Sequence, residues 1–262
     1  MTSVLATKSF VITSFGSTDC GLVRENNEDN FLIDDARGVY AVADGCGGIP
    51  HGDQASLLTI QMIQNFYDEA VFRGDLFIKE MFGEINRAVF QEGHRLNADL
   101  GMATTLTMAQ IVDNMLVIGH VGDSVVYLYR AGTLRQLTAE HTLKAAVCAT
   151  LSPEECENVP EALGHTLTRC IGHKPTVDVD VLEMPLQPGD RVLLCTDGVT
   201  KYLDSEFVEK AFAVATSPEA LVRSLLDEAG ERGGMDNATG VSFFVKGNTP
   251  KIFGLSAAVK AK

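Results

Sequence analysis

The chain has 262 residues, of which 45% are hydrophobic and 21% charged, and its formal net charge is −14. This composition supports a buried core large enough for one large domain or two small ones. An acidic surface of this kind repels phosphate backbones, which argues against nucleic-acid binding, and neither a membrane-spanning apolar run nor the apolar core of a signal peptide is found.

Short apolar stretches bounded by turns predict three strands near the start of the chain, over residues 9–14, 31–33 and 38–43. The second and third are expected to form a hairpin, and a polar loop over residues 16–29 precedes them. Asp53 is expected to cap the first of two amphipathic helices, over residues 57–71 and 78–96. Two long helices in succession need a flat surface to cover.

The middle of the chain predicts four short strands, over residues 104–111, 115–121, 125–129 and 134–137. The connections between them, among them Gly122-Asp123-Ser124, are so short that neighbouring strands are expected to pair antiparallel. The polar segment 138–172 is expected to be an insertion or flap, with a short helix starting at Ser152-Pro153.

The last part of the chain predicts three more strands, over residues 177–182, 191–196 and 239–245. It also predicts two more helices, one over residues 205–214 and one starting at residue 217. We found no internal repeat and no linker. We therefore expect a single domain over residues 1–245, with the flap at about 138–172 and a C-terminal tail over 246–262. Strand runs interrupted by helix pairs indicate an α+β fold of two antiparallel sheets flanked by helices.

Acidic residues recur at five places, each at the end of an apolar run or in a tight turn: Glu28-Asp29, Asp44-Gly45, Asp123, Asp197-Gly198 and Asp236-Asn237. A carboxylate at the mouth of a buried strand is poorly hydrated and needs a positive partner. The sequence places no Lys or Arg directly beside these residues, so a divalent cation is the expected partner. Hard oxygen ligands without nearby His or Cys predict Mg²⁺ or Mn²⁺ rather than zinc.

Each of these motifs also has a simpler explanation when it is taken alone. Asp44-Gly45 and Gly122-Asp123-Ser124 could be ordinary turns, and Asp236-Asn237 could be an Asx turn. Arg24 could be a solvated surface residue. For the simpler explanations to be right, each motif would need its own separate explanation. A single shared site explains all of the motifs together, in the order in which they occur.

Taken in order, the motifs resemble the metal-dependent protein phosphatases (the PPM family), the type 2C serine/threonine phosphatases, and in particular their bacterial branch. The resemblance runs from about residue 16 to residue 245. The segments that carry it are residues 24–29, 43–48, 103–105, 121–124, 167–172, 196–198 and 236–239. Any one segment is weak, but the ordered set is specific.

The resemblance implies an α-β-β-α sandwich with a metal site at one end of its two sheets. It implies seven metal-binding residues: Asp44, which would bridge two cations, Gly45 through its carbonyl, Asp197 and Asp236, Glu28 and Asp29 mostly through metal-bound waters, and Asp123, which together with Asp197 would hold a third, weaker cation. Two cations ~3.5–4 Å apart can share a water, lower its pKa and orient it towards phosphorus. Arg24 would bind the substrate phosphate, which its planar fork suits.

The chain departs from the family pattern at Cys46, at Val125 and in the stretch Glu140-His141-Thr142, where Asp-His-Ser is common. Cys46 stands where eukaryotic members carry a His and many bacterial members a Met, and Val125 stands where Arg is usual. Cys46 could fill the space of that Met, which is the favoured interpretation, or it could be a redox-sensitive thiol. His141 is expected to be structural, capping the flap. The six scattered cysteines form no C-x-x-C pair and are expected to be reduced.

The resemblance implies hydrolysis of phosphoserine and phosphothreonine in proteins, opposing a Ser/Thr protein kinase. We expect a cytoplasmic monomer that uses Mn²⁺ or Mg²⁺ and binds neither nucleic acid nor membrane. One alternative is a catalytically silent scaffold of the same fold that binds a kinase or a regulator. A two-metal nuclease is a further alternative, against which the charge of −14 and the lack of a basic stripe argue.

Overall fold

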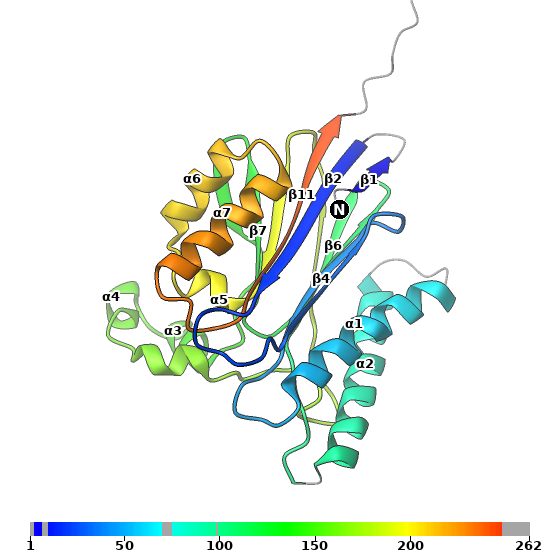
Figure 1. Cartoon of the computed structure of the whole chain (residues 1–262), viewed down its shortest axis with the longest axis vertical. Coiled ribbons are helices and arrows are strands. Elements are labelled where there is room, and N and C mark those ends of the chain that lie inside the picture. The colour runs from blue at the N-terminus through cyan, green and yellow to red at the C-terminus, as the bar shows by residue number, and fades with distance from the viewer. Residues whose placement is uncertain (1–2, 7–9, 70–74, 98, 248–262) are drawn as a thin grey trace, which may run out of the picture.

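The computed structural model describes residues 3–6, 10–69, 75–97 and 99–247, and it forms four layers (Figure 1). Two antiparallel sheets pack face to face in the middle. The helices α1 (Gly52–Glu69) and α2 (Asp75–Leu96) cover the outer face of one sheet, and α6 (Ser205–Val214) and α7 (Pro218–Glu231) cover the outer face of the other. The α-β-β-α sandwich predicted from the sequence is confirmed.

One sheet has five strands in the order β3-β4-β5-β6-β9, and the other has six in the order β1-β2-β11-β10-β7-β8. The strands of the first are β3 (Asp29–Asp34), β4 (Val39–Asp44), β5 (Leu106–Val112), β6 (Met115–Val121) and β9 (Asp180–Pro185). Those of the second are β1 (Ser3–Ala6), β2 (Phe10–Asp19), β7 (Val125–Arg130), β8 (Thr133–Gln136), β10 (Arg191–Cys195) and β11 (Ala238–Gly247).

The central strands are buried on both faces, which explains their unbroken apolar sequences. In β4, Ala41 and Ala43 face the α1–α2 layer, whereas Tyr40 and Val42 point into the core between the sheets. There the ring of Tyr40 stacks on Phe243 of β11, with ring centroids 4.6 Å apart. Both sheets are thus fixed rigidly against each other, and their strand ends are held in place at the edge of the sandwich.

The expected hairpin at Gly122-Asp123-Ser124 is wrong. β6 and β7 belong to different sheets, because Val121 pairs with Leu106 in one sheet while Val125 pairs with Cys195 in the other. The segment between them carries the chain from one sheet to the other. Asp123 is therefore placed at the end of both sheets at once, and not on the outside of a turn.

Other local details also differ from the prediction: β9 runs over Asp180–Pro185 and not over 177–182, and β1 was not predicted. β2 continues to Asp19, because it pairs along its length with β11, so the polar loop starts only at Cys20. α1 starts at Gly52, which places Asp53 in its first turn and not at the cap. A short helix, α5 (Asp197–Thr200), follows β10 and was not predicted. The tail predicted from residue 246 lies outside the described residues, apart from the last two residues of β11.

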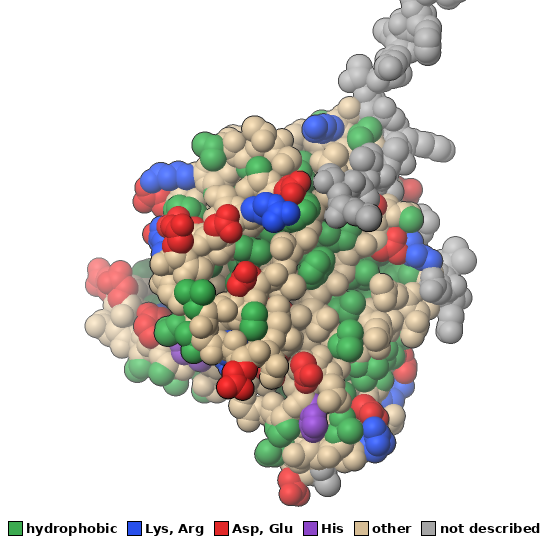
Figure 2. Space-filling model, viewed as in Figure 1, with side chains coloured by type: hydrophobic (Ala, Val, Ile, Leu, Met, Phe, Trp, Pro, Cys, Tyr) green, Lys and Arg blue, Asp and Glu red, His purple; other side chains and the backbone are tan. Residues whose placement is uncertain are grey.

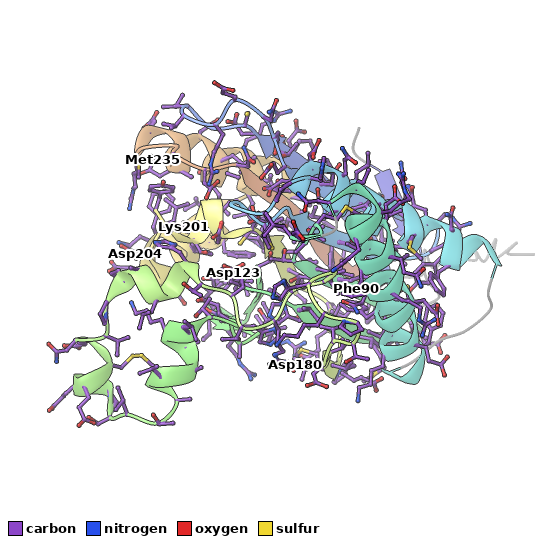
Figure 3. All side chains as sticks on the ribbon, turned by 90° about the horizontal axis from the view of Figure 1, so that it is seen from below. Phe90, Asp123, Asp180, Lys201, Asp204 and Met235 are labelled. Atoms are coloured by element: carbon purple, nitrogen blue, oxygen red, sulfur yellow. A yellow bond between two sulfur atoms is a disulfide. The ribbon has the colours of Figure 1, made fainter. Side chains whose placement is uncertain are left out.

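The segment 138–172 contains the short helices α3 (Leu143–Cys148) and α4 (Pro153–Cys156) and a 3₁₀ turn over Glu161–His165. It projects from one end of the sandwich (Figure 1). Ser152 caps α4 in a capping box with Glu155, as the sequence predicted for this helix start. Cys148 and Cys156 form a disulfide, visible in Figure 3, which corrects the expectation that all six cysteines are reduced. No helix within the described ranges has the length and apolar character to cross a membrane.

Candidate metal and phosphate site

A pocket of about 430 Å³ lies where the two sheets end. It is lined by every residue predicted for the site except Asp29: Arg24, Glu28, Asp44, Gly45, Asp123, Asp197 and Asp236. His165 and Leu167 of the flap segment also line it. The ends of β4, β6 and β10 and the start of β11 meet here, which is why carboxylates far apart in the sequence converge.

The backbone at Asp44 is held by hydrogen bonds to the segment before β5. The Asp44 N–H donates to the Thr105 hydroxyl at 2.9 Å, and the Asp44 carbonyl accepts from the Thr105 N–H at 2.8 Å. The Thr104 hydroxyl donates to the same carbonyl at 2.8 Å, and the Gly45 N–H donates to the Glu28 carbonyl at 3.1 Å. The direction of the Asp44 side chain is therefore set by fixed backbone on both sides.

Asp29 lies beneath the pocket and is buried. Its Oδ2 accepts hydrogen bonds from the hydroxyls of Thr196, at 2.9 Å, and Thr239, at 2.6 Å, and so links β3 to the other sheet. Its Oδ1 has no hydrogen-bond partner among the described residues. An unsatisfied buried carboxylate oxygen is costly, so this atom favours a water or a cation at the pocket floor.

Asn237 is a positioning residue that the sequence analysis missed, because it treated Asp236-Asn237 as one acidic motif. Its Oδ1 accepts from the Glu28 N–H at 2.8 Å, and its Nδ2 donates to the carbonyls of Cys20, at 2.9 Å, and Asn26, at 3.0 Å. The loop that carries Arg24 and Glu28 is therefore fastened to the loop that carries Asp236.

Burial and mutual repulsion disfavour the charged forms of these carboxylates and so raise their pKa values. Burial raises the pKa of Asp29 to about 7, and burial with repulsion from Asp197 does the same for Asp123. Burial, then repulsion from Asp29 and Asp197, raises the pKa of Asp44 well above its usual range. Burial and the neighbouring Asp53 also raise the pKa of Glu28. Such groups bind either protons or cations.

The expectation that no Lys or Arg accompanies these carboxylates is wrong. Lys201 Nζ lies 2.5 Å from Asp197 Oδ2 and 3.0 Å from Asp236 Oδ2, and Arg24 Nη2 lies 2.9 Å from Asp236 Oδ1. No three Asp, Glu, His or Cys side chains of the described chain already surround a single point as metal ligands would. The sequence contains one indication of this contact: Lys201 follows Asp197 by one helical turn, a spacing that brings two side chains together.

The raised pKa values predict how pH acts on the metal-free protein. The folded pKa values of Asp29 and Asp123 lie near 7, above the usual value, so their protonated forms stabilise the fold and this contribution is lost as pH rises through 7. This loss spans the interval from the usual Asp pKa up to 7 and is nearly complete by pH 8. Over its last part, from about pH 7 to pH 8, most His side chains are already neutral, so we expect the melting temperature of EDTA-treated protein to fall there. The gain in melting temperature on adding Mn²⁺ should grow over the same interval. A gain that shrinks with rising pH in a thermal-shift series would contradict this assignment.

The three unusual positions, His141, Cys46 and Val125, have structural explanations. His141 is buried; its Nδ1 accepts from the Gly122 N–H at 3.0 Å and its Nε2 lies 3.1 Å from Asp180 Oδ2, so it braces the segment that holds Asp123. A hydrogen bond with Cys170, together with burial, raises the pKa of the Cys46 thiol, which opposes formation of a reactive thiolate. Val125 is fully buried at the start of β7, where an Arg would lose its hydration.

The comparisons with known proteins agree with this geometry. A model of the protein phosphatase 2C family matches residues 23–229. The serine/threonine phosphatase stp of Listeria welshimeri is 32% identical over 232 residues, which cover 85% of this chain and 91% of that protein. The crystal structure of the serine/threonine phosphatase PstP/Ppp of Mycobacterium tuberculosis is 30% identical, with a TM-score of 0.79, and the match covers 90% of this chain and 99% of that one.

A further solved structure, the catalytic domain of the phosphatase PstP in complex with two manganese ions, matches over the same shares of the two chains with a TM-score of 0.78 and 30% identity. Fold, site and relatives together define a protein serine/threonine phosphatase. The chain belongs to the protein phosphatase 2C family, as its motifs predicted.

The residues present fit divalent cations of the kind found in that relative. The pocket offers carboxylate and carbonyl oxygens, which suit Mg²⁺ and Mn²⁺, and the unsatisfied Oδ1 of Asp29 lies beneath them. The Lys201 ammonium already places one positive charge against Asp197 and Asp236.

Proposed function

We propose that the chain hydrolyses phosphoserine and phosphothreonine in proteins and that it needs Mn²⁺ or Mg²⁺ to do so. The observation that carries the proposal is the convergence of Asp44, Asp123, Asp197 and Asp236 with Arg24 in one pocket. When bound between two cations, a water becomes acidic enough to act as a nucleophile near neutral pH. The chain therefore needs no Ser or Cys nucleophile.

The proposed roles follow the position of each residue in the pocket. Asp44 would bridge two cations, with the Gly45 carbonyl on one of them and Asp197 and Asp236 completing the other. Glu28 and Asp29 would act through water, and the hydrogen bonds from Thr196 and Thr239 would hold Asp29 in place for this. Arg24 would hold the substrate phosphate at the pocket mouth.

Arg24→Ala is expected to raise KM for phosphopeptides about tenfold or more, because a charge-assisted donor to phosphate contributes on the order of 1.5–3 kcal/mol. Arg24 also contacts Asp236, so the assay must run at saturating Mn²⁺. Arg37→Ala is a matched control, because the Arg37 side chain is 42% exposed, against 44% for Arg24, and pairs with Asp34 at the far end of the β3–β4 hairpin. Equal KM values for the Arg24 variant and the unaltered chain would rule out the phosphate role.

We also propose a third, weaker cation between Asp123 and Asp197. Asp123→Ala should leave two tightly bound Mn²⁺ but slow phosphopeptide hydrolysis, since this ion could polarise the water that protonates the leaving group. Mn²⁺ titration calorimetry and a phosphopeptide assay on the same preparation separate the two effects. If the variant loses tight metal binding, or turns over as fast as the unaltered chain, Asp123 has another role.

In the cell, we propose a cytoplasmic, monomeric signalling phosphatase that opposes a Ser/Thr protein kinase, with residues 1–245 as one domain. The silent-scaffold alternative is not favoured, because the pocket keeps its carboxylates and the named relatives are phosphatases. A nuclease is not favoured either. On the face shown in Figure 2, acidic side chains are widespread and the basic ones form no continuous stripe.

The substrate class can be tested with one peptide in three forms, carrying phosphoserine, phosphothreonine or phosphotyrosine, assayed in Mn²⁺ beside single-stranded DNA. We expect phosphate release from the first two forms and no cleavage of DNA. Hydrolysis restricted to phosphotyrosine, or cleavage of DNA with no phosphate release from any peptide, would overturn the proposed function.

A further inference from the structure

Lys201 directly follows α5 as its C-cap residue. Its side chain is 26% exposed and reaches back over the helix to place Nζ 2.5 Å from Asp197 Oδ2 and 3.0 Å from Asp236 Oδ2. Figure 3 views the molecule from the pocket end and shows Lys201 and Asp123 in the same central region, with the flap to one side. The ammonium group thus bridges two carboxylates that come from different loops.

Both oxygens of Asp236 are engaged in this arrangement. Oδ2 accepts from Lys201, while Oδ1 accepts from the Asn237 N–H at 3.0 Å and contacts Arg24 at 2.9 Å. A divalent cation that bound both Asp197 and Asp236 would come within a few Å of the Lys201 ammonium. At such separations two positive charges in a partly buried pocket repel strongly.

We propose that Lys201 is an intramolecular competitor for the metal. In the metal-free protein its ammonium offsets part of the negative charge of Asp197 and Asp236 and keeps the two loops together. It must leave these carboxylates before a divalent cation binds there. Lys201 is thus a positioning residue that sets the metal affinity. This inference rests on the proposed function, because it takes Asp197 and Asp236 as metal ligands.

Competition of this kind has two linked consequences. The ion pairs of Lys201 stabilise the metal-free protein and must break when a cation binds to Asp197 and Asp236. The free energy that these pairs contribute to the metal-free state is therefore lost from the free energy of metal binding. Removing the ammonium should therefore lower the melting temperature of the metal-free protein and tighten Mn²⁺ binding. A Lys201 that merely supported the fold would lower the melting temperature without tightening binding.

The test is calorimetric titration of Mn²⁺ into EDTA-stripped protein, with melting temperatures measured in parallel. Lys201→Met is expected to bind Mn²⁺ about five- to tenfold more tightly, the scale of one or two partly exposed ion pairs. Lys201→Arg keeps the charge and should bind close to the unaltered affinity. Lys144→Met is the matched control, because Lys144 is 27% exposed, borders a neighbouring pocket with Lys201, and pairs with Glu161 at 2.6 Å without contacting Asp197 or Asp236. It should leave Mn²⁺ affinity unchanged.

A second measurement uses the unaltered chain and does not depend on how a variant folds. Lysine acylation mapped by mass spectrometry should modify Lys201 faster in Mn²⁺ than in EDTA, because the metal releases its amine into solvent, while Lys144 reacts at the same rate in both. Equal acylation of Lys201 in both conditions, or unchanged or weaker Mn²⁺ binding by Lys201→Met, would overturn the inference alone. An unaltered chain that binds no Mn²⁺ would overturn both the inference and the metal-dependent function.

Discussion

Asp44→Asn is expected to reduce kcat by ~10³-fold or more, on the order of 4 kcal/mol, because the proposed bridging ligand loses its charge at the centre of the site. Asn keeps the shape of the side chain, and the backbone bonds from Asp44 to Thr104 and Thr105 do not involve the carboxylate. The fold should therefore persist, and the metal-free protein should be at least as stable, because burial and acidic neighbours disfavour the charged form of Asp44.

Asp34→Asn provides the comparison for this variant. Asp34 lies on the same β3–β4 hairpin but at its far end, where it pairs with Arg37. This substitution should leave kcat and Mn²⁺ binding unchanged. Calorimetry on Asp44→Asn that showed two Mn²⁺ sites of unaltered affinity would contradict the bridging role.

Gly198→Ala is expected to remove activity by displacing two loops of the site at once. An added Cβ at Gly198 would meet the carbonyl oxygen of Asn237 far inside contact distance, and backbone atoms cannot move aside as a flexible side chain can. Asn237 holds the Glu28 N–H and the loop that carries Arg24, so a shift there spreads across the pocket. We expect a loss of about 3 kcal/mol or more in the free energy of unfolding.

Gly83→Ala is the control, because Gly83 lies inside α2 and a Cβ there would meet nothing within 4 Å. Alanine in an open helical position should stabilise the protein by roughly 0.5–1 kcal/mol. Chemical denaturation of both variants measures the contrast. A Gly198→Ala protein with unaltered stability and activity would show that the two loops are less tightly coupled than their packing indicates.

The sequence predicted most strands and helices closely, because their local signals were strong. β6 begins and ends at the predicted residues, since Asp113 adopts a positive φ of 56° in the turn before it and Gly122 follows it. α6 also has the predicted bounds, with Asp204 capping its first turn. The sequence also predicted the carboxylates of the site from local signals, because each one lies at the end of a buried strand or in a loop.

What the sequence could not supply depends on contacts between distant segments. Two short strands joined by Gly122-Asp123-Ser124 look like a hairpin, and only the pairing of Val125 with Cys195 places β7 in the other sheet. The roles of Asn237 and Thr105 likewise depend on loops that meet only in the folded chain. Lys201 was overlooked for a different reason. Its partner Asp197 is close in sequence, but the helix that joins them is a single turn with no amphipathic pattern to reveal it.

The most direct test of the metal-dependent phosphatase account is phosphate release from a phosphothreonine peptide by the purified chain, measured in Mn²⁺, after EDTA treatment, and after Mn²⁺ is returned in excess. We expect turnover in Mn²⁺, none in EDTA, and recovery on add-back, with Asp44→Asn inactive throughout. Turnover that persists in EDTA, or an unaltered chain that releases no phosphate at any Mn²⁺ concentration, would contradict the account.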